Sequence, residues 1–378
     1  MNIFLIARGY PSSKEPTWGC FEKDQALALS EAGHQVTIIS VDTRFRFYWR
    51  TLGIQRIVEN KITAYNIFLL PYAVLFFLPR RIKDKFYAWQ LEQVYKRAIK
   101  EQGTPDILYT HYLQNTHKAI RIHSKYNIPI VGIEHWSQMG FHPIPRAAIR
   151  LAKNTYPFIN KLLTVSSALK DNIQTLGFDS TVVPNIVSKD FAYLPTQRSS
   201  APLQIVSTGR LVKGKRFDLL IQAIANIQHP VEVNIIGNGP EYNTLEHLIQ
   251  ELKLQDKIKL LGYKTKEEVV TILRKSDIFV LPSQSETFGV AYIEALACGL
   301  PIIATDCGGP RDIVTPENGL LIPVDNLEAL TQAILKMIDH LPSYSREHIA
   351  QDCQQRFAAE AIAGQLTSIF QEVHRQTH

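Results

Sequence analysis

The feature that most restricts the fold of this chain is residues 280–310, which read VLPSQSETFGVAYIEALACGLPIIATDCGGP. They begin at the end of an apolar run that Pro282 terminates, which predicts a buried strand reaching its carboxyl end. Apolar residues then recur at helical spacing from Val290, and Gly299 and Pro301 end that pattern. A buried strand, a short loop and a helix in this order predict one unit of an open α/β sheet.

Two acidic residues lie in this stretch, Glu286 in the loop and Glu294 about two turns into the helix. Eight helical residues span ~12 Å, more than the roughly 5–9.5 Å between the carboxylates of glycoside hydrolases, so the spacing disfavours a hydrolase pair. The backbone N–H groups of Phe288, Gly289 and Val290 lie at the helix start, where a phosphate is favoured. A long phosphorylated ligand there would reach one acid at each end. The alternative is one capping acid and one solvated acid.

The run SETFGVAYIEALACGLPIIAT, with Glu286 and Glu294 eight positions apart, resembles the signature of family 4 glycosyltransferases. Members of that family are retaining enzymes of GT-B fold. The resemblance implies an α/β protein with two doubly wound, Rossmann-like domains facing across a cleft. It also implies a nucleoside diphosphate sugar as donor, with Glu286 orienting the sugar hydroxyls and Glu294 the ribose.

The length of 378 residues predicts two domains. The stretch from 189 to 202 is polar and contains proline and serine, which is typical of a domain boundary. We therefore expect an N-terminal acceptor-side domain over 1–190 and a C-terminal domain over 191–355 that binds the nucleotide sugar. The resemblance suggests that a last helix, 356–378, crosses back to the first domain.

The four cysteines show neither CxxC spacing nor the pattern of a short secreted framework. We therefore expect a reduced, cytoplasmic chain without a cysteine metal site. The opening MNIFLIARGYP carries Arg8 inside its apolar run, which argues against a signal peptide. Residues 62–79 contain no charge, but Pro71 interrupts them, so a buried strand followed by an apolar loop or short helix is favoured over a membrane span.

Charge is unevenly distributed along the chain. Residues 1–190 contain 24 Lys and Arg against 14 Asp and Glu, or +10, and residues 191–378 contain 17 against 21, or −4. A basic half suits an anionic membrane, a phosphorylated acceptor or nucleic acid, and nucleic acid ranks last because no recognisable module accompanies it. A peripheral membrane contact on the inner face would use the cluster that follows the apolar run, Arg80, Arg81, Lys83 and Lys85; the alternative is a solvated basic face.

Three candidate positions in the first half come after predicted strands. Gly19 lies where a helix begins, and glycine allows close backbone approach to a ligand. His111 and His135 each follow an apolar strand, where open α/β sheets form their binding crevice. His111 ranks below His135, and a purely structural histidine is its alternative. By resemblance, His135 contacts sugar and phosphate, and Gly19 belongs to a glycine loop that touches donor phosphate and acceptor. At Pro16, Gly19, Phe21 and Gln25, this loop is similar to that of a subset of the family that acts on bacterial surface polysaccharides.

In the second half, Arg210 and Lys215 flank a tight loop before a helix, so both can project onto phosphates at the Gly289 helix start. The family pattern has glycine where this chain has Arg216, which leaves Lys213 as an alternative to Lys215. The resemblance adds Ser207, Gly237 and Tyr263 to the donor-binding residues. GNGPEY lacks the third glycine of a dinucleotide fingerprint, which weakens a dehydrogenase interpretation.

The resemblance implies a retaining glycosyltransferase that moves a hexose or N-acetylhexosamine onto a glycan or lipid-linked acceptor in capsule, O-antigen or similar polysaccharide synthesis. Arg210 and Lys215 would stabilise the leaving diphosphate. No Asp-x-Asp motif is present, so neither a metal nor another cofactor is expected. The alternatives are an epimerase or hydrolase of nucleotide sugars on the same fold, and a non-catalytic subunit that binds nucleotide sugar.

Overall fold

The computed structural model describes residues 1–12, 14–15, 18–45, 50–71, 75, 77–195 and 202–377, with the Arg80 and Arg81 side chains left out. Pro16 and residues 196–201 of the expected boundary lie outside these ranges. The chain forms two compact units. Unit 1 comprises Met1–Val165, Leu169–Ile186 and Ala359–His378, and unit 2 comprises Ser166–Ala168 and Val187–Ala358. Each unit contains one sheet with helices, which confirms the predicted fold of two Rossmann-like domains.

Unit 1 is built on an eight-stranded sheet in the order β3-β4-β2-β1-β5-β6-β7-β8. All described pairs are parallel except the edge pair β3·β4. The central strand β1 is buried over Ile3–Ala7, because helices cover both faces of a parallel sheet. The strands are β1 (Asn2–Ala7), β2 (Gln35–Val41), β3 (Gly53–Glu59), β4 (Ile62–Phe68), β5 (Ile107–His111), β6 (Ile130–Glu134), β7 (Lys161–Thr164) and β8 (Thr181–Val182).

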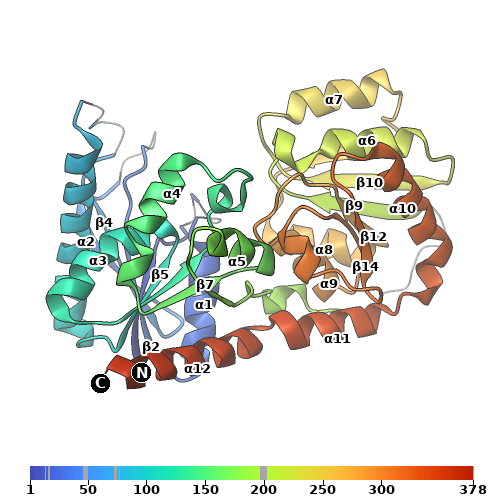
Figure 1. Cartoon of the computed structure of the whole chain (residues 1–378). Helices are drawn as coiled ribbons and strands as arrows, with labels where there is room; N and C mark the ends of the chain where they lie inside the picture. The colour runs from blue at the N-terminus through green and yellow to red at the C-terminus, as the bar shows by residue number, and fades with distance from the viewer. Residues whose placement is uncertain are drawn as a thin grey trace. The chain divides into compact units, whose positions relative to one another are not determined.

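The helices of unit 1 form two layers. Helices α1 and α12 pack together on one face of the sheet, while α2 packs on α3 and α3 on α4 on the other (Figure 1). This arrangement follows from right-handed crossovers, because the chain moves along the sheet in opposite directions before and after β4. The helices are α1 (Cys20–Glu31), α2 (Arg80–Gln102), α3 (Leu113–Tyr126), α4 (Arg146–Lys153), α5 (Ser167–Gln174) and α12 (Ala359–Thr377).

Unit 2 has a six-stranded parallel sheet in the order β11-β10-β9-β12-β13-β14. Its strand β12 contains the apolar residues that come directly before Pro282, and it is buried throughout. The strands are β9 (Leu203–Thr208), β10 (Val231–Ile236), β11 (Ile258–Gly262), β12 (Ile278–Leu281), β13 (Ile302–Thr305) and β14 (Gly319–Ile322); the helices are α6 (Phe217–Ala225), α7 (Tyr242–Glu251), α8 (Lys266–Lys275), α9 (Val290–Ala297), α10 (Leu327–His340) and α11 (Arg346–Phe357).

The sequence predicts a last helix over 356–378, and in the structure this helix, α12, begins at Ala359. Two helices, α11 and α12, meet at Ala358, whose φ of −65° and ψ of 157° are extended rather than helical. Buried Phe357 ends α11 in unit 2, whereas α12 packs on α1 in unit 1. The helical pattern continues across Ala358 in the sequence, so periodicity alone did not locate the break.

Residues 62–79 begin as the expected buried strand, β4. Pro71 follows β4, and residues 72–74 and 76 lie outside the described part of the chain. Among the helices that the structure describes, none is long and apolar enough to cross a membrane.

Candidate functional site

The strand order of unit 2 reverses between β9 and β12, the first and fourth strands of its sheet. Ligands of open α/β sheets bind outside the carboxyl ends of the strands at such a reversal. Lys215 follows β9, and Glu286 follows β12. The topology therefore brings residues 71 positions apart in the sequence to one place.

Lys215 and Glu286 form an ion pair there, between Nζ and Oε1. The hydroxyl of Ser283 donates a second hydrogen bond to the same oxygen, at 2.8 Å. The side chains of Lys215 and Glu286 are 25% and 11% exposed, so a ligand in solution can reach the ammonium group. Oε1 thus has two donors, and the second carboxylate oxygen has none among the described residues, which leaves it available as an acceptor.

The loop that carries Glu286 rests on the loop after β13. The backbone N–H of Glu286 donates to the Cys307 carbonyl at 3.3 Å, and its carbonyl accepts from Gly309 at 2.8 Å. A Cβ at Gly309 would lie 2.3 Å from the Phe288 Cα, so only glycine fits at this contact. Backbone contacts on both sides therefore fix Glu286 without using its carboxylate.

Helix α9 begins at Gly289, in a left-handed conformation with φ of 106°. A Cβ at Gly289 would lie 2.5 Å from the ring of buried Tyr292. Both the backbone conformation and the packing therefore require glycine at this position. Within the described chain, no side chain caps this helix start. The first N–H groups of α9 can therefore donate hydrogen bonds to an anionic ligand, as the sequence predicts. The Phe288 side chain is only 2% exposed, so this residue can contribute only its backbone.

The second cation, Arg210, follows β9 and is exposed. It makes no ion pair with another residue that the structure describes. Arg216, where the family has glycine, adopts the left-handed conformation expected for glycine, with φ of 53°. Its guanidinium pairs with Asp218 and Asp325. Lys213 is exposed, and the structure brings Lys215, not Lys213, to Glu286.

Four further candidates in unit 2 have different surroundings. Gly237 is a packing position, because a Cβ there would lie 1.8 Å from the Gly209 carbonyl oxygen. Ser207 is fully buried, and its hydroxyl has no hydrogen-bond partner among the residues that the structure describes. Tyr263 is 58% exposed just past β11. The Glu294 side chain is half-buried in the second turn of α9.

In unit 1 the strand order reverses between β1 and β5. His111 ends β5 and His135 follows β6, and their rings stack with centroids 5.2 Å apart and planes at 7°. Burial lowers the pKa of His111 to about 3. Burial, and to a smaller extent the neighbouring His111, lowers the pKa of His135 well below its usual value. Both imidazoles are therefore neutral at physiological pH, and within the described part of the chain Nε2 of His135 has no hydrogen-bond partner.

Glu134, directly before His135, holds this corner together. Its carboxylate accepts from the backbone N–H groups of Leu113 at 3.2 Å, His135 at 2.9 Å and Trp136 at 2.8 Å. The Tyr156 hydroxyl donates to it at 2.9 Å. Burial raises the pKa of Glu134 to about 7, although these donors oppose the shift.

A second group, missed by the sequence interpretation, surrounds Arg8 at the end of β1. Arg8 pairs with buried Glu22 at 2.9 Å, and its guanidinium carbon lies 4.1 Å from the centroid of the Tyr112 ring. Tyr112 has φ of 69°, uncommon for a residue with a side chain, and its ring lies 5.1 Å from that of His135. The signals were present, since Arg8 directly follows an apolar strand and Glu22 lies three residues after Gly19. The backbone of Gly19 lies close to that of Gly9, because a Cβ at position 19 would lie 2.4 Å from the Gly9 carbonyl oxygen.

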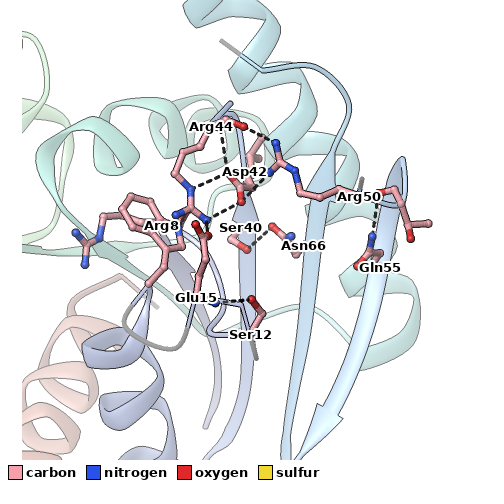
Figure 2. A network of polar contacts seen from close by, with 12 residues as sticks. Arg8, Ser12, Glu15, Ser40, Asp42, Arg44, Arg50, Gln55 and Asn66 are labelled. Atoms are coloured by element: carbon pink, nitrogen blue, oxygen red, sulfur yellow. Dashed lines mark hydrogen bonds and ion pairs between the residues drawn. The ribbon is translucent and has the colours of Figure 1, made fainter. Parts of the chain in front are cut away.

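Another polar network of unit 1 surrounds Asp42, the residue after β2 (Figure 2). Arg44 donates to Asp42 at 2.8 and 2.9 Å and pairs with Glu15 at 2.8 Å. Arg50 also reaches Asp42, at 3.0 Å. Each described cation of this network has an acidic partner, so this edge of unit 1 has little free charge, unlike Arg210 in unit 2.

Comparison with known proteins places these features in a family. Residues 195–352 match the model of "Glycosyl transferases group 1", and residues 23–191 match "Glycosyltransferase Family 4". A Bacillus subtilis protein named a teichuronic acid biosynthesis glycosyltransferase, TuaC, is 26% identical over 96% of this chain and 95% of its own. An uncharacterized glycosyltransferase of Methanocaldococcus jannaschii is 30% identical over 69% of this chain and 73% of its own.

Solved structures share the fold. A sucrose-phosphate synthase from Thermosynechococcus elongatus has a TM-score of 0.81 at 19% identity, with 100% of both chains covered. Anabaena HepE in complex with UDP-glucose has a TM-score of 0.71 at 18% identity, covering 98% of this chain and 100% of that one.

Proposed function

This chain belongs to glycosyltransferase family 4, and we propose that it moves a hexose or N-acetylhexosamine from a nucleoside diphosphate sugar to a glycan or lipid-linked acceptor, with retention of anomeric configuration. The observation that carries the proposal is the accessible ion pair of Lys215 and Glu286 at the strand reversal of unit 2. A cation and an acceptor carboxylate in contact suit a ligand with a diphosphate next to a sugar. Binding of UDP-glucose by the HepE neighbour supports this donor class.

The donor would exchange the ion pair for two separate contacts. The diphosphate would take Lys215, exposed Arg210 and the N–H groups at the start of α9, because all three carry positive charge and no side chain caps the helix. Glu286, released from Lys215, would accept hydrogen bonds from sugar hydroxyls. Glu294, in the second turn of the same helix, would bind the ribose.

Transfer requires stabilisation of the charge that develops on the leaving diphosphate. Lys215 and Arg210 would provide it without a metal ion, and fixed cations aimed at developing charge are usually the largest single catalytic contribution. In unit 1, neutral His135 offers an unused ring nitrogen that suits a sugar hydroxyl better than a charged imidazolium would. We assign no nucleophile.

The acceptor is proposed to be a growing surface polysaccharide or a lipid-linked precursor of one. The name of the Bacillus relative, which refers to teichuronic acid biosynthesis, supports a polysaccharide. A lipid-linked acceptor would place the reaction at the inner face of an anionic membrane, and the +10 balance of residues 1–190 supports peripheral contact there.

The test is incubation with a panel of UDP-, GDP- and ADP-sugars, with and without lipid-linked or oligosaccharide acceptors. A transferase releases nucleoside diphosphate only, or much faster, with acceptor, and yields a lengthened acceptor. Acceptor-independent release to free sugar would show a hydrolase, and a changed sugar on intact nucleotide would show an epimerase. Binding of a nucleotide sugar without turnover under any condition would show a non-catalytic subunit.

A further inference from the structure

Three helices of unit 1 carry the whole charge excess of its sequence half. Together α2, α3 and α4 contain 13 Lys and Arg against 3 Asp and Glu, or +10, which equals the balance of residues 1–190. The opposite layer, α1 and α12, contains 2 Lys and Arg against 5 Asp and Glu, or −3. The two faces of one sheet therefore differ by 13 charges, and Figure 1 shows α2, α3 and α4 as one layer.

The Lys and Arg residues of α3 and α4 recur at helical spacing, and all of them are exposed except Lys118, whose Nζ lies 3.4 Å from the centroid of the Tyr87 ring of α2. In α4, all three basic residues are exposed and recur at i, i+4 and i+7: Arg146, Arg150 and Lys153. They line a hollow of about 430 Å³ with Ile149 and Asn154. In α3, Lys118, Arg121 and Lys125 recur at i, i+3 and i+7, and the last two are exposed. Each helix thus presents one basic stripe.

Two of the three acids of the layer, Glu92 and Glu101, form ion pairs with several cations. Glu92 of α2 is 2% exposed and accepts Arg121 at 2.9 Å and Lys125 at 2.5 Å from α3. Glu101 pairs with Arg97 and, from β3, with Arg56. Each of these carboxylates meets more than one cation, so positive charge remains on the surface.

Apolar side chains lie on the same layer at the start of α2. Phe77 is 67% exposed, Ile82 is 49% exposed and Trp89 is 42% exposed. The Phe86 ring stacks on Trp89 with centroids 5.7 Å apart. Lys85, directly before Phe86 in the sequence, is exposed. Exposed aromatic and aliphatic groups among cations are typical of surfaces that lie in a membrane interface.

We infer that the outer faces of α2, α3 and α4 together form a surface that docks on an anionic bilayer, with Ile82 and Trp89 entering the interface and the α3 and α4 stripes lying over the lipid headgroups. This inference rests on the peripheral membrane contact proposed above. It extends that contact from the basic cluster of residues 80–85 to the outer faces of all three helices. An anionic bilayer fits better than nucleic acid, because exposed Ile82 and Phe77 gain from hydrocarbon and not from a phosphate backbone. Binding is expected to weaken with salt.

The experiment compares two triple variants that lose the same charge. Arg146→Gln, Arg150→Gln and Lys153→Gln remove the α4 stripe; Lys253→Gln, Lys275→Gln and Lys336→Gln remove three exposed lysines of unit 2. Partition into vesicles of phosphatidylcholine with 30% phosphatidylserine at 0.1 M salt should fall about a hundredfold for the α4 variant. The control variant should change less than about threefold. Circular dichroism verifies that both fold.

A second measurement tests the apolar part. Brominated lipid in the same vesicles should quench tryptophan emission of the natural chain, and Trp89→Phe should lose most of that quenching. Equal loss of partition in both triple variants, no preference for anionic over neutral vesicles, or stronger retention by a DNA duplex than by vesicles would overturn the assignment. Donor turnover with a soluble acceptor should stay unchanged in the α4 variant, so failure of docking and failure of the sugar-transfer proposal give different results.

Discussion

Both sheets reverse their strand order beside their first strand, between β1 and β5 in unit 1 and between β9 and β12 in unit 2. At the unit 2 reversal, Lys215 is 25% exposed and Arg210 is exposed without an ion-pair partner among the described residues. At the unit 1 reversal, Glu22 and His111 are fully buried, and Arg8 is paired. Similar topology therefore supports a charged, accessible edge in one unit and a packed, nearly neutral edge in the other.

The difference indicates a division of tasks. A diphosphate needs cations that it can reach, and partly exposed Lys215 and exposed Arg210 satisfy this. Neutral sugar hydroxyls need fixed hydrogen-bonding groups, and burial provides these. The predictions below test this contrast at one edge or the other.

The largest effect is expected at the exposed edge. Lys215→Ala should lower kcat by about 10²–10³-fold at saturating donor, the usual result of removing one group that stabilises developing charge. Lys213→Ala is the matched control, since Lys213 is exposed two positions away and does not contact Glu286. Steady-state kinetics decides, and equal kcat values for the two variants would refute the role of Lys215.

At the buried edge, the pKa of Glu134 predicts a pH dependence of stability. Its pKa is raised by burial to about 7 in the folded state, above its ordinary 4.5, so the folded state holds the proton more tightly. Stability from this group is therefore full below about pH 4.5 and is lost as pH rises to about 7, by up to about 3 kcal/mol.

Glu134→Gln removes this titration, so the unfolding transition of unit 1 should depend less on pH in the variant. Denaturant unfolding at several pH values between 4.5 and 7.5 measures the difference. Parallel pH curves for the natural chain and the variant would show that Glu134 does not titrate in this range.

A smaller effect is expected for the ribose contact. Glu294→Ala should raise the donor KM about tenfold with kcat within about twofold, because a ribose contact exists equally in the ground and transition states. Glu251→Ala, an exposed acid of α7, is the control. A fall in kcat at unchanged KM would place Glu294 in the chemical step instead.

No effect is expected from chelation. Turnover should persist in EDTA, because Arg210, Lys215 and the start of α9 already supply positive charge to the diphosphate. Activity that disappears in EDTA and returns with Mg²⁺ or Mn²⁺ would show that these groups are not sufficient.

The sequence predicted the fold well because parallel strands are buried on both faces and read as unbroken apolar runs, as in residues 278–281. It also placed Glu286 and Gly289 in the correct loop and helix start. It could not show that Lys215 contacts Glu286, since 71 residues separate them and only the order of the strands joins them. The break at Ala358 and the packing role of Gly237 depend on backbone neighbours from other segments, which periodicity does not reveal.

Arg8 and Glu134 were missed for a related reason. Sequence patterns treat a charge next to an apolar strand as the end of that strand. Here Glu134 is buried and Arg8 half-buried, and their partners come from elsewhere in the chain. The same pattern identified His135, because its position after β6 could be compared with a family motif.

Hydrogen–deuterium exchange with and without a nucleoside diphosphate tests the contrast between the two edges most directly. We predict slower exchange in unit 2, over the loop that contains Lys215 and over the Glu286 loop and the start of α9, with little change near Arg8 or His135 in unit 1. Protection confined to unit 1, or none in the Glu286 loop at saturating nucleotide, would contradict the assignment of the diphosphate to the Lys215–Glu286 edge.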